Sequence, residues 1–143
     1  MIIGIDFDGT CVTHEFPNIG NDIGAIPVLK RLVAEGHKLI LFTMRSDITS
    51  PTSKDSDIVP EGGNYLTDAI NWFKENDIPL WGINENPEQK TWTHSPKPYC
   101  HLYIDDSAFG CPLITPMDKN KRPYVDWVFV SDTLFGNDEV HGQ

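Results

Sequence analysis

The first ten residues limit what this chain can fold into more than any other segment. An apolar run over 2–7 includes Asp6, and Asp8 follows it directly. A short apolar run of this kind predicts a buried strand. Residues two apart on a strand point to the same side, so the carboxylates of Asp6 and Asp8 are expected to face one small volume. Their mutual repulsion then requires a cation between them or a proton on one of them.

Buried apolar runs and segments of helical periodicity alternate along the rest of the chain. We expect helices over 22–35 and 64–76, and further strands over 38–43, 79–83, 101–105 and 111–115. Residues 124–135 fit either type, because their apolar spacing is helical while their Val and aromatic content favours a strand. Alternating strands and helices predict parallel crossovers. The expected fold is therefore a three-layer α/β sandwich with a central, mostly parallel, Rossmann-like sheet.

Two segments show neither a helical periodicity nor the apolar run of a strand. Residues 11–21 are expected to form a hairpin or flap, and residues 44–63 a long polar loop rich in Ser, Thr, Asp and Pro. Loops of that length are usually functional or mobile. The chain has 143 residues, which one hydrophobic core fills, so we expect a single domain over 1–143.

Composition excludes several classes of function. Eleven basic residues stand against 21 acidic ones, giving a formal net charge of -10. This charge disfavours a long nucleic acid as a partner, since binding it needs a basic face, whereas an acidic chain suits cations. No apolar run reaches the roughly 20 residues that cross a bilayer, and no secretion signal is expected. The three cysteines form no Cys-x-x-Cys pair, which favours a reducing cytoplasm.

Acidic or polar residues also follow the other predicted strands. Thr43 ends the strand over 38–43, and Asp105 and Asp106 end the strand over 101–105. Ligands bind at the carboxyl ends of parallel strands, so these side chains are expected to meet Asp6 and Asp8 in one crevice. Single acids at strand ends are commonly turn residues or helix caps. Two acidic pairs on separate strands instead favour a divalent cation with oxygen ligands, most simply Mg²⁺.

An anion site is the natural complement of such a cation site. The Thr43 hydroxyl and nearby backbone amides are candidates to hold an anion, although a lone Thr more often caps a helix or fills a strand position. Lys97, flanked by Pro96 and Pro98, is a candidate for a fixed positive charge beside a phosphate, and Lys90 competes for that role. A single lysine is more often a solvated surface charge.

These residues together resemble the haloacid dehalogenase superfamily. The segment Ile2-Ile3-Gly4-Ile5-Asp6-Phe7-Asp8-Gly9-Thr10 looks like the first family motif, an apolar strand followed by Asp-x-Asp-Gly-Thr. Leu39-Ile40-Leu41-Phe42-Thr43 resembles the second, Lys97 stands for the third, and Tyr103-Ile104-Asp105-Asp106 is similar to the fourth. The four occur in the family's order and span residues 2–106.

The resemblance implies a phosphatase. Asp6 would attack a phosphoryl group and form an aspartyl-phosphate, and Asp8 would act as general acid and then as general base. The acid at position 8 is typical of phosphoryl-transfer members and absent from dehalogenases. Mg²⁺ would be held by Asp6, by Asp8 through its carbonyl, and by the fourth-motif acids, with Asp106 favoured as the direct ligand and Asp105 orienting. Thr43, Lys97, Gly9 and Thr10 would hold the phosphate.

Family members often carry an inserted cap domain. The cap is inserted either after the first motif or between the second and third motifs. Here the flap and one helix fill the first of these intervals, and the loop 44–63 with one helix, one strand and a second loop fills the other. We therefore expect a small member without a cap domain, with the loop 44–63 partly replacing it. Such an open crevice goes with large or partner-supplied substrates, or with a homo-oligomer that closes the site.

Arg45 and Met44 are candidate substrate contacts beyond Thr43. The Thr-x-Arg sequence resembles that of polynucleotide 3′-phosphatases and some nucleotidases, whereas a surface Arg45 paired with Asp47 is the plainer alternative. Trp92 is the tryptophan placed to face the crevice. The five histidines show no ligand spacing and receive no role.

Three functions therefore stay open. The leading one is a Mg²⁺-dependent phosphatase acting on a small phosphorylated metabolite or a nucleotide. A non-enzymatic phosphoacceptor or binding module on the same fold is the first alternative. The second is a polynucleotide or nucleotide phosphatase whose substrate a partner supplies.

Overall fold

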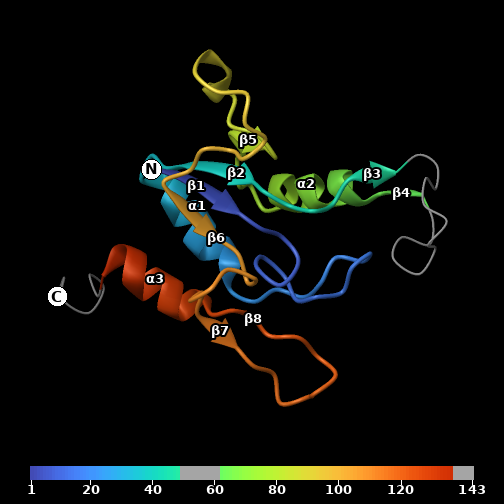
Figure 1. Ribbon diagram of the computed structural model, residues 1–143. Helices are drawn as coiled ribbons and strands as arrows, with labels where there is room; N and C mark the ends of the chain where they lie inside the picture. Colours follow the sequence, from blue (N-terminus) through green and yellow to red (C-terminus); the bar gives the residue numbers. More distant parts are fainter. Residues whose placement is uncertain (49–61, 137–143) are drawn as a thin grey trace.

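The computed structural model describes residues 1–48 and 62–136 (Figure 1). Its elements in chain order are β1 (Ile2–Ile5), α1 (Ala25–Ala34), β2 (Lys38–Leu41), β3 (Asp47–Ile48), β4 (Gly63–Asn64), α2 (Tyr65–Glu75), β5 (Gly82–Ile83), the 3₁₀ turn η1 (Gln89–Thr91), β6 (Leu102–Ile104), β7 (Leu113–Ile114), β8 (Tyr124–Val125) and α3 (Trp127–Phe135).

A four-stranded parallel sheet organises these elements. Its strand order is β5-β2-β1-β6, and β1 pairs in parallel with both neighbours, Ile5 lying opposite Leu41 of β2 and Ile104 of β6. The carboxyl ends of β2, β1 and β6 therefore lie side by side at one edge of the sheet (Figure 1). The predicted α/β class and parallel central sheet are confirmed, although each strand is shorter than its apolar run.

The hydrophobic core lies on one face of this sheet. Ile3, Ile5 and Phe7 point into it from β1 and its extension, and each is fully buried. All three helices contribute to the same cluster: α1 through Leu29, α2 through Phe73 and α3 through Trp127. This arrangement follows from chain order, since the right-handed crossovers from β1 to β2 and from β2 to β5 put α1 and α2 on the same side.

The opposite face is covered without an α-helix. The chain returns from β5 to β6 through residues 84–101, whose regular structure is limited to η1, and Lys97, Pro98 and Cys100 at its end contact that face. Prolines at 87, 96 and 98 explain this, because proline removes a helical donor and clashes with the preceding turn. Gly4 leaves room for this cover: a Cβ there would press on Cys100 Sγ and the Tyr103 ring. The third layer of the predicted sandwich is thus irregular chain rather than helix.

The C-terminal part resolves an ambiguity of the sequence. Residues 124–135 contain both structures, the short strand β8 followed by α3. Asp126 separates them, since its side chain accepts a hydrogen bond from the Phe129 amide at 3.2 Å and so caps α3. The strand predicted over 111–115 exists as β7, but it pairs antiparallel with β8 in a separate hairpin and does not extend the main sheet.

Backbone pairing closes each of the two predicted loops. The flap 11–21 closes on itself as a hairpin, with the Thr13 amide bonded to the Asn21 carbonyl at 3.1 Å. The ends of the loop 44–63 pair antiparallel, β3 with β4. Residues 49–61 lie outside the described residues, and with them the prediction that this loop replaces a cap.

Within the described ranges, the helices are all too short to cross a bilayer, the longest being α2 with 11 residues.

Candidate functional site

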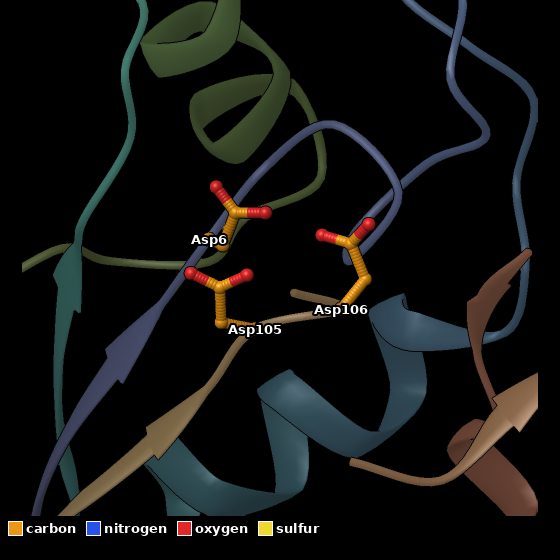
Figure 2. Close-up of side chains that lie close together, drawn as sticks. All are labelled: Asp6, Asp105 and Asp106. Atoms are coloured by element: carbon orange, nitrogen blue, oxygen red, sulfur yellow. The ribbon is translucent and has the colours of Figure 1, made fainter. Parts of the chain in front are cut away.

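Three carboxylates meet at the carboxyl edge of the sheet. Asp6 follows β1, and Asp105 and Asp106 follow β6; one oxygen of each lies within 4.8 Å of the others. Figure 2 shows the three side chains turned toward one another from the two strand ends. The sheet enforces this meeting, because the Asp6 amide still bonds the Ile104 carbonyl at 3.0 Å one residue beyond the strand. The predicted convergence of these three acids is therefore present.

Crowding of these acids changes the protonation of Asp6. Burial is the largest influence, followed by a hydrogen bond with the Asp106 carboxyl and the charge of Asp105, and together they raise the pKa of Asp6 to about 8. Each of these influences disfavours a third negative charge in a partly dry site. An Asp that holds a proton near neutrality for these reasons is poised to exchange it for a cation.

Thr10 ties two of the acids together. It is fully buried, and its hydroxyl lies 2.9 Å from Asp6 Oδ2 and 3.2 Å from Asp106 Oδ1, while it accepts the Asp106 amide at 3.1 Å. Its own amide bonds the Phe7 carbonyl, and the Gly9 amide bonds the Val12 carbonyl. In this arrangement Gly9 and Thr10 shape the loop and orient the acids, and the phosphate-binding role predicted for them stays a prediction.

A tryptophan from the far end of the chain holds the same loop. Trp127 is 2% exposed, and its indole Nε1 donates to the Thr10 carbonyl at 2.6 Å. The first residue of α3 therefore fixes a loop that begins at residue 6. Sequence reasoning missed this contact, since nothing local to Trp127 identifies its partner.

His14 is a second residue that the sequence left without a role. Its Nε2 lies 2.8 Å from Asp106 Oδ2, and both side chains are mostly buried. Gly9 makes room for it: a Cβ at Gly9, whose φ is +80°, would overlap His14 Nε2 and crowd Asp106 Oδ2. The flap thus supports one acid of the cluster through a histidine with no recognisable ligand spacing.

The Asp8 carboxylate faces a different partner. Arg45 donates from Nε to Asp8 Oδ2 and from Nη2 to Asp8 Oδ1, each at 2.8 Å. The Asp8 side chain is thereby directed to the guanidinium, and it is not one of the three acids that cluster. Its predicted contribution to a metal through the backbone carbonyl stays a prediction.

The position of Arg45 agrees with neither of the two roles expected from the sequence, a substrate contact or a surface ion pair with Asp47. The residue is 4% exposed, and its remaining N–H groups donate to the carbonyls of Pro17, Asn18 and Tyr65. A guanidinium has five N–H groups and all five are used, so none is left for a substrate phosphate in this arrangement. The alternative pairing with Asp47 is also wrong: Asp47 accepts hydrogen bonds from Thr67, which lower its pKa.

The end of β2 is braced from β5. The Thr43 amide donates to Asn84 Oδ1 at 2.8 Å, and the Thr43 hydroxyl accepts the Arg45 amide at 3.1 Å. Asn84 has a φ of +54°, a conformation that Asn tolerates better than most residues. Thr43 therefore lies at the predicted strand end with its hydroxyl in a local turn, and the side chain of Met44 is fully exposed.

The candidate lysines lie on the irregular face. Lys97 Nζ lies 5.2 Å from the centroid of the Tyr103 ring, and Tyr103 precedes Asp105 by two residues on β6. Among the described residues Lys97 forms no ion pair with an acid of the cluster. Lys90 lines a separate depression with Asn84 and Pro96.

Trp92 does not face the crevice. Its ring packs edge-on against Tyr99, with centroids 5.7 Å apart, and Tyr99 packs on His101. The His101 amide bonds the Ile2 carbonyl, so this aromatic group lies at the amino end of the strands, opposite the acids. The prediction for Trp92 is therefore wrong.

A polar pocket adjoins the acidic cluster between the flap and the β7–β8 hairpin. Its lining includes Thr13, His14, Glu15, Asn21, Pro116, Lys121, Arg122 and Tyr124. His14 connects the pocket to Asp106, and two other lining residues form an ion pair, with Lys121 Nζ 3.2 Å from Glu15 Oε1. The pocket thus places basic and hydroxyl donors next to the acids.

Comparisons with known proteins give one informative likeness. The chain is similar to a solved structure described as a conserved protein coded by locus from Bacteroides thetaiotaomicron, with 29% sequence identity and a TM-score of 0.67. The likeness covers 96% of this chain and 91% of that one. No family model and no curated protein matches.

Proposed function

We propose that this protein is a Mg²⁺-dependent phosphatase with the fold and mechanism of the haloacid dehalogenase superfamily, of the small type without a cap domain. The observation that carries the proposal is the meeting of Asp6, Asp105 and Asp106 at the carboxyl edge of the sheet. Beside them, Asp8 lies two residues from the candidate nucleophile, as phosphoryl transfer in this family requires. The motifs quoted above and this geometry support the same reading.

The donor set fits a hard divalent cation. Oxygen is the ligand atom that Mg²⁺ prefers, and three carboxylates within 4.8 Å supply it. The raised pKa of Asp6 fits as well, because a nearby cation removes the repulsion that holds the proton there. Asp6 and Asp106 would hold the ion with the Asp8 carbonyl, and Asp105 would orient them. When bound, Mg²⁺ supplies positive charge that draws the nucleophile and the phosphate together.

The residues of this chain divide the reaction between them. An Asp6 oxygen attacks the phosphorus of a phosphomonoester, and the bond from phosphorus to the ester oxygen breaks. Asp8 gives a proton to the leaving oxygen and afterwards takes one from the water that attacks the aspartyl-phosphate, which restores Asp6 and releases phosphate. Thr43 and Lys97 are the proposed contacts to the phosphoryl oxygens.

A small anionic substrate is the class that we propose. The net charge of -10 disfavours a long nucleic acid, and the pocket beside the acids carries the cationic side chains of Lys121 and Arg122, the former paired with Glu15. Sugar phosphates and nucleotides carry the hydroxyl and phosphate groups that such donors bind. Met44, fully exposed beyond Thr43, stays a candidate substrate contact.

The test is phosphate release from an aryl phosphate and from a panel of sugar phosphates and nucleotides. We expect release that requires Mg²⁺, stops with EDTA and is absent from Asp6→Asn. Release that persists with EDTA would contradict the proposed metal. Single-turnover labelling without release would instead favour the phosphoacceptor function, because a signalling module is modified once whereas an enzyme turns over.

A further inference from the structure

We propose that Arg45 is a positioning residue that sets the orientation of Asp8 and couples it to the flap. The inference rests on the proposed phosphatase function, in which Asp8 exchanges a proton with the leaving group and with water. It assigns to Arg45 a role different from the substrate contact expected from the sequence.

The geometry of the pair is that of a fixed support. The two oxygens of Asp8 each accept one N–H of Arg45 at 2.8 Å, the parallel arrangement that holds a carboxylate plane most rigidly. The side chain of Arg45 is 1% exposed, whereas that of Asp8 is 18% exposed. Arg45 therefore supports Asp8 from behind, and the open side of the carboxyl group keeps a lone pair on which a proton can be carried to the leaving group or taken from a water.

The other donors of Arg45 reach two further segments. Nη2 donates to the Asn18 carbonyl at 2.9 Å and Nη1 to the Pro17 carbonyl at 3.4 Å, both in the flap, while Nη1 also donates to the Tyr65 carbonyl at the start of α2 at 3.1 Å. One guanidinium thus joins the loop after β1, the flap and α2. Each of these three segments is therefore coupled to the other two through the Arg45 side chain.

Aromatic rings enclose the same group. The guanidinium carbon lies 5.1 Å from the centroid of Phe7 and 5.0 Å from that of Phe16, and Phe16 in turn packs on Tyr65 with centroids 5.3 Å apart. Lysine cannot replace arginine here, because an ammonium lacks the planar fork that reaches two oxygens and three carbonyls at once. Arg45→Lys is therefore a substitution that keeps the charge and removes the positioning.

The dependence of kcat on the leaving group distinguishes a role of Arg45 in positioning Asp8 from a general structural role. A good leaving group such as p-nitrophenolate needs little proton donation, while an alkyl alkoxide needs it fully. We expect Arg45→Lys to lower kcat on an alkyl phosphate by about 100-fold, the range of general acid catalysis, and kcat on p-nitrophenyl phosphate by less than about 10-fold. Asp8→Asn should show the same pattern.

A double-mutant cycle and a matched control complete the kinetic test. If Arg45 acts through Asp8, Arg45→Lys combined with Asp8→Asn is no slower than Asp8→Asn alone. Arg31→Lys makes the same change at the ion pair with Glu35 on α1, at 3.1 Å, and leaves both rates unchanged. Equal losses on both substrates, or multiplication of the two single effects, would overturn the proposal.

Amide exchange tests the coupling without any activity. The Asn18 amide bonds the Glu15 carbonyl at 2.8 Å inside the flap, so the exchange rate of this amide reports how often that hydrogen bond opens. We expect its exchange to be at least about 10-fold faster in Arg45→Lys, and also in Asp8→Ala, which tests the coupling should Arg45→Lys not fold. Unchanged exchange in the folded variants would refute the coupling. Absence of phosphate release by the wild-type protein would instead count against the proposed function, with the exchange result still deciding the role of Arg45.

Discussion

Asp6 and Asp8 lie two residues apart and yet have opposite surroundings. Asp6 faces Asp105 and Asp106 from β6, and its pKa rises to about 8. Asp8 faces the guanidinium of Arg45, which comes from the segment after β2. The difference arises because β1 is the strand between β6 and β2, so that its extension meets an acidic strand end on one side and a basic one on the other. Two identical side chains are thereby suited to two different tasks.

The largest expected effect comes from removing the carboxylate of Asp6, the acid that faces Asp105 and Asp106. Asp6→Asn deletes the proposed nucleophile, and we expect kcat to fall by at least about 10³-fold, as for other covalent catalysts. Phosphate release at saturating substrate and Mg²⁺ measures it. Asp68→Asn on α2 is the matched control, and a loss of similar size in Asp68→Asn would mean that the effect is not specific to the cluster.

His14 tests the support behind the cluster. We expect His14→Ala to weaken Mg²⁺ affinity by about 10- to 100-fold, the usual effect of removing a hydrogen-bond partner of a ligand. Titration calorimetry with Mg²⁺ gives the affinity directly. His94→Ala, in the exposed segment between β5 and β6, should leave it unchanged. An affinity in His14→Ala equal to that of the wild type would show that His14 does not support the metal site.

The raised pKa of Asp6 predicts how stability depends on pH in EDTA. The unfolded chain releases this proton near pH 3.8 and the folded chain near pH 8, so the free energy of unfolding falls as pH rises between these values, by up to about 1.4 kcal/mol per unit. Urea unfolding across pH 5–9 measures the slope. In Asp6→Asn this contribution disappears and the slope should be shallower; identical slopes would contradict the assigned protonation.

The smallest effect distinguishes the two lysines. Lys97 lies against Tyr103, which precedes Asp105 by two residues, whereas Lys90 lines the depression with Asn84 and Pro96. We expect Lys97→Gln to raise KM by about 10-fold, the loss of one charge-assisted contact to phosphate, and Lys90→Gln to leave it unchanged. The opposite ranking would assign the phosphate contact to Lys90.

Sequence patterns predicted those parts of the fold that depend on local periodicity. The apolar runs before Asp6 and Asp105 form adjacent strands, and the apolar spacing of Leu66, Ile70 and Phe73 forms α2. The meeting of Asp6 with Asp105 and Asp106 was predictable to the same extent, since parallel strands bring their carboxyl ends together whatever the loops do.

Contacts between distant loops were not predictable in this way. Arg45 reaches Asp8, Asn18 and Tyr65 because three loops fold around it, and no periodicity encodes that meeting. His14 and Trp127 contact the first loop for the same reason. The error over Trp92 has a related cause: it precedes a site residue in the chain, but the chain turns at Tyr99 and carries it to the other end of the strands.

Acid quenching of a single turnover shows directly whether Asp6 is the residue that carries the phosphoryl group. The protein is mixed with radiolabelled substrate and Mg²⁺, quenched within milliseconds and digested for mass spectrometry. We expect an acid-stable label on Asp6 that appears before free phosphate, decays as phosphate is released and is absent from Asp6→Asn. Phosphate release with no labelled protein at any time, or a label on Asp8 or Asp105, would contradict it.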